Sequence, residues 1–242
     1  MKKNGRIFFL SCLFIFVSCL GMWFFYNSDS NYLRESSEIQ KQYKEVSDKN
    51  DEVGEELQEE VDIITEYQNK FNNNDIIAEL ALENTTLKVP VAKTNDNEYY
   101  LDHLLDKRKN KMGSIFMDYR NNTDDRKILI YGHNSKTVNT EFHLLESYLK
   151  PSFLKEHSKM FLKTKDTMYQ YQIFSIIIVT TDYQHMKLKF TDQEYKDHLE
   201  WLKSNSVYDT NIPVFETDEI LILQTCYYYP DNSYLLVVGK KI

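Results

Sequence analysis

Glycine and cysteine are both scarce in this chain. Only 6 of its 242 residues are glycine, which leaves too few for a glycine-rich phosphate loop, and no nucleotide-binding fingerprint is present. Of the 3 cysteines, Cys12 and Cys19 lie in an apolar N-terminal stretch, so Cys226 stands alone in the rest of the chain. A lone thiol forms no intrachain disulfide. Cys226 is therefore either a small buried apolar residue or a reactive group.

Basic residues are fewer than acidic ones, 29 against 37. The formal net charge is −8, and the sequence shows no basic patch of the kind that nucleic-acid-binding domains carry. A nucleic-acid partner is not expected. The net charge itself concerns solubility rather than substrate choice.

The N-terminus combines basic residues with an uncharged apolar run. Lys2, Lys3 and Arg6 precede residues 7–26, which contain no charge and have about the 20 residues needed to cross a bilayer. A cleaved signal peptide is the alternative, but its apolar region is normally about 7–15 residues long and ends in small residues. The aromatic run 23–26 favours an uncleaved anchor. Because the basic residues come first, we expect a cytoplasmic N-terminus and an extracellular remainder.

Residues 27–75 differ from both flanking regions. They are rich in Glu, Lys, Gln and Asn, with scattered apolar residues at spacings of three, four and seven. This spacing predicts a helix, with Gly54 as a weak point. We interpret the segment as a polar, solvated helical stalk; a coiled coil is the alternative, although its heptads are interrupted.

Residues 76–242 are predicted to form one domain of ordinary size that is mostly β. Short segments rich in β-branched or aromatic residues are typical of strands, and helical patterns occur between them. Many short strands with a few peripheral helices favour a closed or nearly closed β-barrel. The predicted strands are 87–91, 114–117, 127–131, 160–163, 168–180, 219–225 and 234–239; the predicted helices are 99–105, 144–149 and 192–205.

A reactive cysteine needs a neighbouring base, because the thiolate is the nucleophile. His133 follows the predicted strand 127–131 and one glycine, where a side chain can project into a cleft. Cys226 likewise ends a predicted strand, so the two form a candidate Cys–His pair. The other histidines lie among charged and polar residues and are expected at the solvated surface: His103, His143, His157, His185 and His198.

Several segments resemble the sortases, the membrane-anchored transpeptidases of Gram-positive bacteria. IYGHNSK at 130–136 and ILQTC at 222–226 are similar to the two catalytic signatures of that family. The class B branch is the most similar. Further matches, in the expected order, are DNEYYL at 96–101, GSIFMDYRN at 113–121, LKSNSVYD at 202–209 and LVVGK at 236–240.

The resemblance implies an eight-stranded sortase-type β-barrel, preceded by an anchor (1–26) and a stalk (27–75). It implies that Cys226 attacks the Thr carbonyl of a C-terminal sorting signal on a secreted protein, and that a cell-wall precursor amine then releases the acyl-enzyme. His133 matches the general acid/base. Asn97, Leu101 and Thr225 match substrate-binding positions. No metal or organic cofactor is implied.

One position departs from the family pattern. Sortases carry an Arg on the last strand, where this sequence has Tyr234, and no Arg follows Arg126. Loss of one oxyanion donor costs roughly 2.7–4 kcal/mol in other enzymes. Tyr234 is a candidate substitute donor, and Arg120 and Lys240 are candidates to reach in from elsewhere. The alternatives are a degenerate peptide-binding protein with low turnover and a cysteine protease that uses water as acceptor.

Overall fold

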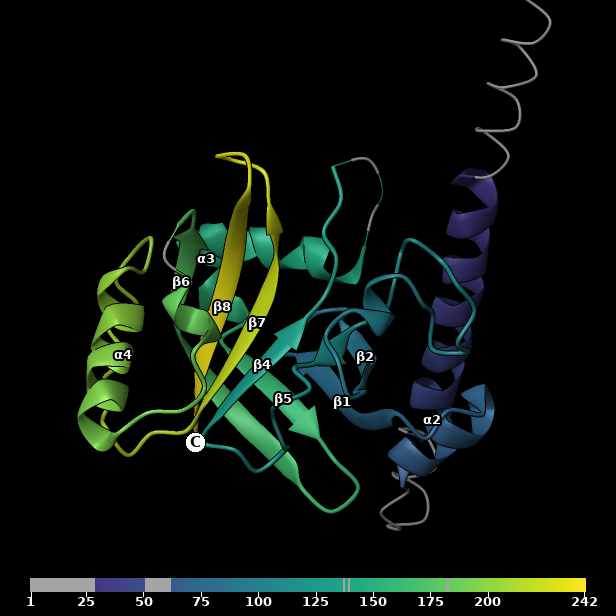
Figure 1. Ribbon diagram of the computed structural model, residues 1–242, viewed down its shortest axis with the longest axis horizontal. Coiled ribbons are helices and arrows are strands. Elements are labelled where there is room, and N and C mark those ends of the chain that lie inside the picture. The colour runs from purple at the N-terminus through teal and green to yellow at the C-terminus, as the bar shows by residue number, and fades with distance from the viewer. Residues whose placement is uncertain (1–28, 51–61, 137, 139, 182) are drawn as a thin grey trace, which may run out of the picture.

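Eight β-strands form a closed barrel (Figure 1). The computed structural model of the protein describes residues 29–50, 62–136, 138, 140–181 and 183–242. In their order around the barrel, the strands are β1 (Ile76–Leu82), β2 (Lys88–Ala92), β3 (Phe116–Met117), β4 (Lys127–Tyr131), β7 (Ile220–Tyr227), β8 (Ser233–Lys241), β6 (Met168–Val179) and β5 (Lys159–Lys163).

The strands β4, β7 and β8 are the part of the barrel that positions the site. β4 runs parallel to β7, and β7 runs antiparallel to β8. All of β4 and the first 6 residues of β7 are buried, as expected for apolar strands covered on both faces. Because parallel strands end at the same edge of a sheet, the segments after Tyr131 and Tyr227 emerge together.

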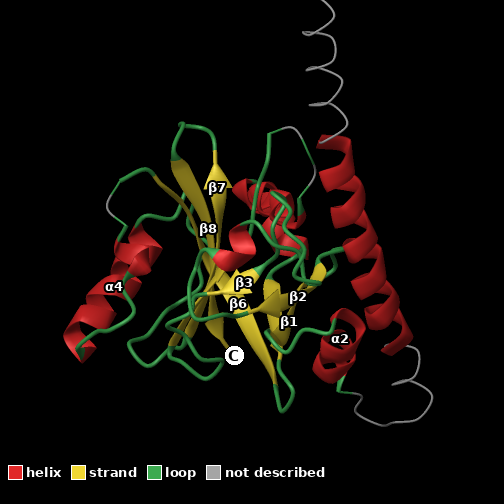
Figure 2. Cartoon of the chain, turned by 45° about the vertical axis from the view of Figure 1, so that its right-hand side comes forward, coloured by secondary structure: helices red, strands yellow, loops and turns green. Residues whose placement is uncertain are grey.

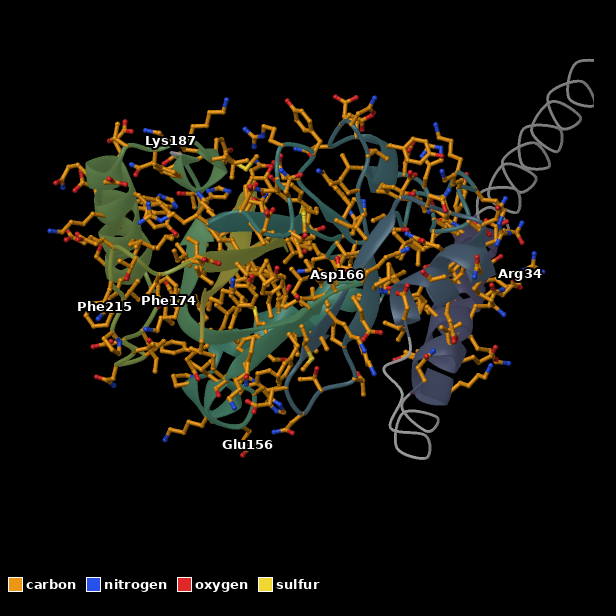
Figure 3. The ribbon with its side chains drawn as sticks, turned by 90° about the horizontal axis from the view of Figure 1, so that it is seen from below. Arg34, Glu156, Asp166, Phe174, Lys187 and Phe215 are labelled. Carbon is orange, nitrogen blue, oxygen red and sulfur yellow. The ribbon has the colours of Figure 1, made fainter. Side chains whose placement is uncertain are left out.

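The helices lie outside the barrel (Figure 2). They are α2 (Ile63–Phe71), α3 (Pro151–Glu156) and α4 (Asp192–Ser204), with the 3-10 segments η1 (Tyr99–Leu101), η2 (Glu141–Leu149) and η3 (Gln184–Met186) and the helix at residues 29–50. A capping box between Thr191 and Glu194 begins α4. Figure 1 shows α4 on the side of the barrel opposite the helix 29–50, and Figure 3 places Arg34 and Phe215 near the two ends of the molecule.

The predicted eight-stranded barrel with peripheral helices is confirmed. The strand β1 is the one that the sequence did not predict. Its residues include Ala78, Glu79 and Ala81, which favour helix over strand. Glu79 is nevertheless buried, and it accepts a hydrogen bond from Tyr67 on α2.

The described part of the predicted stalk packs against the barrel domain and is not fully solvated. In the helix 29–50, Ile39 and Tyr43 are 4% and 3% exposed. Gln40 and Tyr43 donate hydrogen bonds of 3.0 and 3.1 Å to Glu141 on η2. The domain boundary at residue 76 stays a prediction.

The predicted anchor at residues 7–26 lies outside the described residues. Within the ranges that the structure does describe, no helix combines the length and apolar character needed to cross a membrane.

Candidate active site

Cys226 lies near the end of β7, directly across from Tyr234 on β8. Its thiol is half-buried, and burial raises the pKa of this thiol above its ordinary value. Residues directly opposite on antiparallel strands place their side chains on the same face, with Cβ atoms about 4.5–5.5 Å apart. The side chains of Cys226 and Tyr234 therefore lie on the same face of the sheet.

His133 lies at the neighbouring strand end. The register pairs Tyr131 with Gln224, and the pairing continues as Gly132 N donates to Gln224 O at 3.2 Å. Thr225 Oγ1 then donates to Gly132 O at 2.8 Å, which ties β7 to the residue before His133. His133 and Cys226 are each two residues beyond the paired Tyr131 and Gln224. The fold thus brings the two chemically important side chains to one edge of the barrel.

The His133 ring is held by a backbone carbonyl. Its Nε2 lies 2.7 Å from Leu101 O, and because a carbonyl only accepts, Nε2 carries a proton. In the neutral ring, Nδ1 is then the nitrogen able to accept a proton. Within the described part of the chain, the ring and the Cys226 thiol are not hydrogen-bonded to each other. In unliganded enzymes, catalytic hydrogen bonds are often absent or long until substrate binds.

Gly113 gives His133 the space that this arrangement needs. It has a φ of +59°, and a Cβ there would lie 2.7 Å from Leu101 O and 2.9 Å from His133 Cδ2. Glycine is thus required both by the left-handed backbone and by the close approach. This residue was not predicted as functional, although it opens the 113–121 segment that resembles the family.

Asn134 holds the backbone of Cys226 by a hydrogen bond. Its Nδ2 donates to Cys226 O at 3.0 Å and to a Glu146 carboxylate oxygen, while its Oδ1 lies 2.9 Å from His143 Nδ1. Tyr228 Oη donates to Asn134 O at 2.8 Å. The sequence offered no signal for this network beyond the position of Asn134 next to His133.

Tyr234 is partly exposed and lies among aromatic rings. Ring centroids lie 5.8 Å away for Tyr183 and 6.4 Å away for His185. Burial raises the pKa of the Tyr234 phenol, and proximity to Cys226 adds to the rise, so the hydroxyl stays a neutral donor. Its oxygen has no hydrogen-bond partner among the residues that the structure describes.

The two alternative cations are engaged elsewhere. Arg120 makes hydrogen bonds of 2.9 and 2.7 Å to Asp118. Lys240 pairs with Ile220 at the opposite end of the β7–β8 ladder from Cys226, and its Nζ lies 3.3 Å from Asp218. Tyr234, directly opposite Cys226, is therefore the better-placed donor candidate.

Asn97 and Asp118 belong to a polar cluster that also includes Arg120 and Tyr131. Burial disfavours the Asp118 carboxylate, but hydrogen bonds from Arg120, Tyr131 and Asn97 outweigh it and lower its pKa to about 2. Asn97 donates to Asp118 at 3.0 Å and accepts from Tyr119 N at 2.9 Å. Asp118 therefore stabilises this cluster and, in the described part of the chain, makes no hydrogen bond to His133. Leu101 is 43% exposed, whereas Thr225 is 2% exposed.

Two histidines expected at the surface are buried, and the prediction was wrong for both. His185 is fully buried, and its Nε2 lies 2.9 Å from Gln224 Oε1. His198 is 4% exposed and lies 2.9 Å from Lys127 Nζ. Its place on α4, next to Leu199 and three residues after Tyr195, was a signal of the buried face. Across the described ranges, no three His, Cys, Asp or Glu side chains form a group able to hold a metal ion.

Comparison with known proteins agrees with this geometry. The sortase domain family matches residues 80–242. The chain belongs to the sortase family. A curated relative, sortase B of Listeria monocytogenes serovar 1/2a, is 33% identical over 175 residues, which cover 70% of this chain and 71% of the relative. This sortase is thus a class B member and a cysteine transpeptidase.

Solved structures of class B sortases share the fold. A Staphylococcus aureus sortase B–substrate complex superposes with a TM-score of 0.73 at 30% identity, covering 88% of this sortase and 97% of that chain. A sortase B complexed with triglycine gives a TM-score of 0.73 at 30% identity, covering 88% of this sortase and 98% of that chain.

Proposed function

We propose that this sortase cleaves a C-terminal sorting signal after Thr, holds the secreted protein as a thioester on Cys226, and transfers it to a cell-wall amine. One observation carries the proposal: Cys226 shares a face with the free hydroxyl of Tyr234 and a strand edge with His133. The relatives in complex with a substrate and with triglycine support the two substrate classes.

The raised pKa of Cys226 defines the first step. At neutral pH the buried group is a thiol, so the Sγ–C bond forms as the thiol proton passes to His133. The tetrahedral intermediate then expels the leaving amine, which takes that proton from His133, and the C–N bond breaks. In the second half, the acceptor amine attacks the thioester carbon and its proton passes to His133. The C–S bond then breaks, and the Cys226 sulfur takes that proton back from His133 as the new amide forms.

The remaining site residues stabilise the developing charge or position the peptide and His133. Tyr234 donates its hydroxyl hydrogen to the carbonyl oxygen as negative charge develops there. Asn97 and Leu101 lie on the segment that holds His133, and Leu101 has the exposure to contact the peptide. Since Thr225 is buried and bonded to Gly132 O, its influence on substrate is indirect, through the position of His133.

We also propose that residues 7–26 anchor this sortase in the cell membrane, with the N-terminus cytoplasmic and the catalytic domain outside. The support is the apolar length of the run and the basic residues before it.

The test is turnover of a fluorogenic sorting-signal peptide by the purified full-length chain, with and without triglycine. We expect cleavage that Cys226→Ala abolishes and that triglycine redirects from the free acid to an amide product. Cleavage indifferent to triglycine would instead establish a cysteine protease. Peptide binding without Cys226-dependent cleavage would establish the binding protein that the missing Arg suggests.

A further inference from the structure

A hollow lies between the helix 29–50 and η2. It has a volume of about 430 Å³, and we call it the η2 cleft. The helix contributes one wall, the residues leading into β2 contribute a second, and η2 contributes the third. The polar residues that line it and matter here are Tyr43, Lys44, Thr140, Glu141, Glu146 and Lys150.

One wall of the η2 cleft carries a buried hydroxyl without a partner. Thr140 is 5% exposed and lines the cleft. Its Oγ1 has no hydrogen-bond partner among the described residues, and it makes no capping bond to η2. A buried hydroxyl left unpaired is costly, and a polar ligand in the cleft would satisfy it.

Two carboxylates and two lysines line the η2 cleft. Each carboxylate has one oxygen engaged: Glu141 accepts from Gln40 and Tyr43, and Glu146 accepts from Asn134. The second oxygen of each makes no hydrogen bond within the described residues. Lys44 and Lys150 supply the positive charges, and neither forms an ion pair in the described part of the chain.

This set of groups matches a ligand that carries both an ammonium and a carboxylate. An ammonium has three donors, which suit the free carboxylate oxygens and the Thr140 hydroxyl. A carboxylate suits the lysines. A peptide with a free amine and a free carboxyl end has both groups, and 430 Å³ lies within the usual range for small-ligand sites.

The η2 cleft is joined to the nucleophile through one side chain. Asn134 donates from the same Nδ2 to Glu146 in the cleft wall and to Cys226 O. Asn134 thus connects Glu146 in the cleft wall with the backbone carbonyl of Cys226. Lys44, in contrast, lies on the helix 29–50, on the far wall.

We propose that the η2 cleft binds the acceptor substrate, an amine-bearing peptide with a carboxylate, with its amine end at Glu146 and Thr140 and its carboxylate at Lys44 and Lys150. The role as acceptor site rests on the proposed transpeptidation. The binding itself does not require turnover, so the two are testable separately.

Binding is measured by calorimetry on the full-length Cys226→Ala protein in detergent micelles. The probes are triglycine, N-acetyl-triglycine, which lacks the amine, and triglycine amide, which lacks the carboxylate. We expect triglycine to bind and each modified peptide to bind roughly tenfold more weakly, as one charge-assisted contact is worth about a factor of ten. Absence of triglycine binding, or equal binding of all three peptides, would overturn the site.

Variants then assign each end of the ligand. Glu146→Gln is expected to remove the preference for triglycine over N-acetyl-triglycine. Lys150→Gln is expected to remove the preference for triglycine over triglycine amide. Thr140→Val is expected to weaken triglycine a few-fold without loss of stability, since its hydroxyl is unpaired. The matched controls are Glu156→Gln and Lys155→Gln on α3; Figure 3 shows Glu156 at the outer edge of the molecule.

The outcomes separate the two proposals. One outcome is that the cleft variants and the control variants show the same preference for triglycine over N-acetyl-triglycine and over triglycine amide. In that case the η2 cleft is not the binding site, even where the wild-type chain transfers peptides to triglycine. If triglycine binds as expected but no Cys226-dependent cleavage occurs, the cleft stands as a binding site and the transpeptidase role is wrong.

Discussion

We propose that the hydroxyl of Tyr234 stands where other sortases have a guanidinium. The β7–β8 register fixes the backbone of Tyr234 directly opposite Cys226. A neutral phenol offers one donor, whereas arginine offers a charged fork. We therefore expect this sortase to depend on Tyr234 yet to be slower than members with the Arg.

Tyr234→Phe removes that donor and keeps the ring. We expect kcat/KM for the sorting-signal peptide to fall roughly tenfold to hundredfold, less than loss of a full oxyanion donor in other enzymes. Tyr169→Phe, at the far end of β6, is the control and should match the wild type. If Tyr234→Phe also matches the wild type and Tyr234→Arg changes nothing, the hydroxyl is not a catalytic donor.

Gly113→Ala tests how His133 is held. The new Cβ would lie 2.6 Å from Tyr100 O and 2.7 Å from Leu101 O, so the carbonyl that bonds His133 has to move. We expect kcat/KM to drop roughly tenfold or more, as small misplacements do elsewhere. Asn211→Ala introduces alanine at a similar φ of 58° away from the site. Equal effects of the two variants on activity would show that only stability was changed.

At the scale of elements, the helix 29–50 is a packed part of the fold. Tyr43 is buried and bonded to Glu141, so Tyr43→Ala should lower the free energy of unfolding by about 3 kcal/mol. Leu33, on the same helix, is 39% exposed, and Leu33→Ala should cost less than about 1 kcal/mol. Urea unfolding of the full-length chain measures both. Similar small losses would mean that the helix stands free of the barrel.

The packing of α4 on β4 makes stability depend on pH. Burial, together with the nearby Lys127 ammonium, lowers the pKa of His198 below its ordinary value. The unfolded chain therefore binds a proton on His198 that the folded chain does not, and stability falls as pH drops below about 6.5. A histidine with a carboxylate partner has the opposite effect, since its folded-state pKa is raised and stability is lost as pH rises.

His198→Gln removes this titration and keeps an oxygen that can accept from Lys127. We expect the free energy of unfolding, measured in urea from about pH 4.5 to 7.5, to fall less steeply with acid than in the wild type. At the alkaline end of that range the two proteins differ only by the substitution itself. Parallel curves across the whole range would contradict the assignment to His198.

At the scale of the whole molecule, the sequence predicted more of the barrel than of its polar interior. The segment 127–131 was predicted with the bounds of β4, because a short, continuous apolar run between polar residues is typical of a buried strand. β1 was not, since Ala78 and Glu79 favour helix and the strand is paired on one side with β5, far along the chain. The eighth strand was expected only through the family resemblance.

The candidate site divides in the same way. Cys226 and His133 each end an apolar strand, which is visible in the sequence. The roles of Asn134, Gly113 and Thr140 depend on contacts between residues 12 to 92 positions apart or on an unpaired atom. Lys127 was not singled out because a buried lysine, bonded to His185 O at 2.8 Å, runs against the ordinary preference of that residue for solvent.

The central claim is that Cys226 carries the secreted protein as a thioester. Intact-mass spectrometry of the full-length chain, mixed with a sorting-signal peptide and quenched in acid, tests it most directly. We expect an acyl adduct that maps to Cys226, is absent from Cys226→Ala, and is discharged by triglycine. An unmodified chain after complete peptide cleavage, or an adduct that persists in Cys226→Ala, would contradict it.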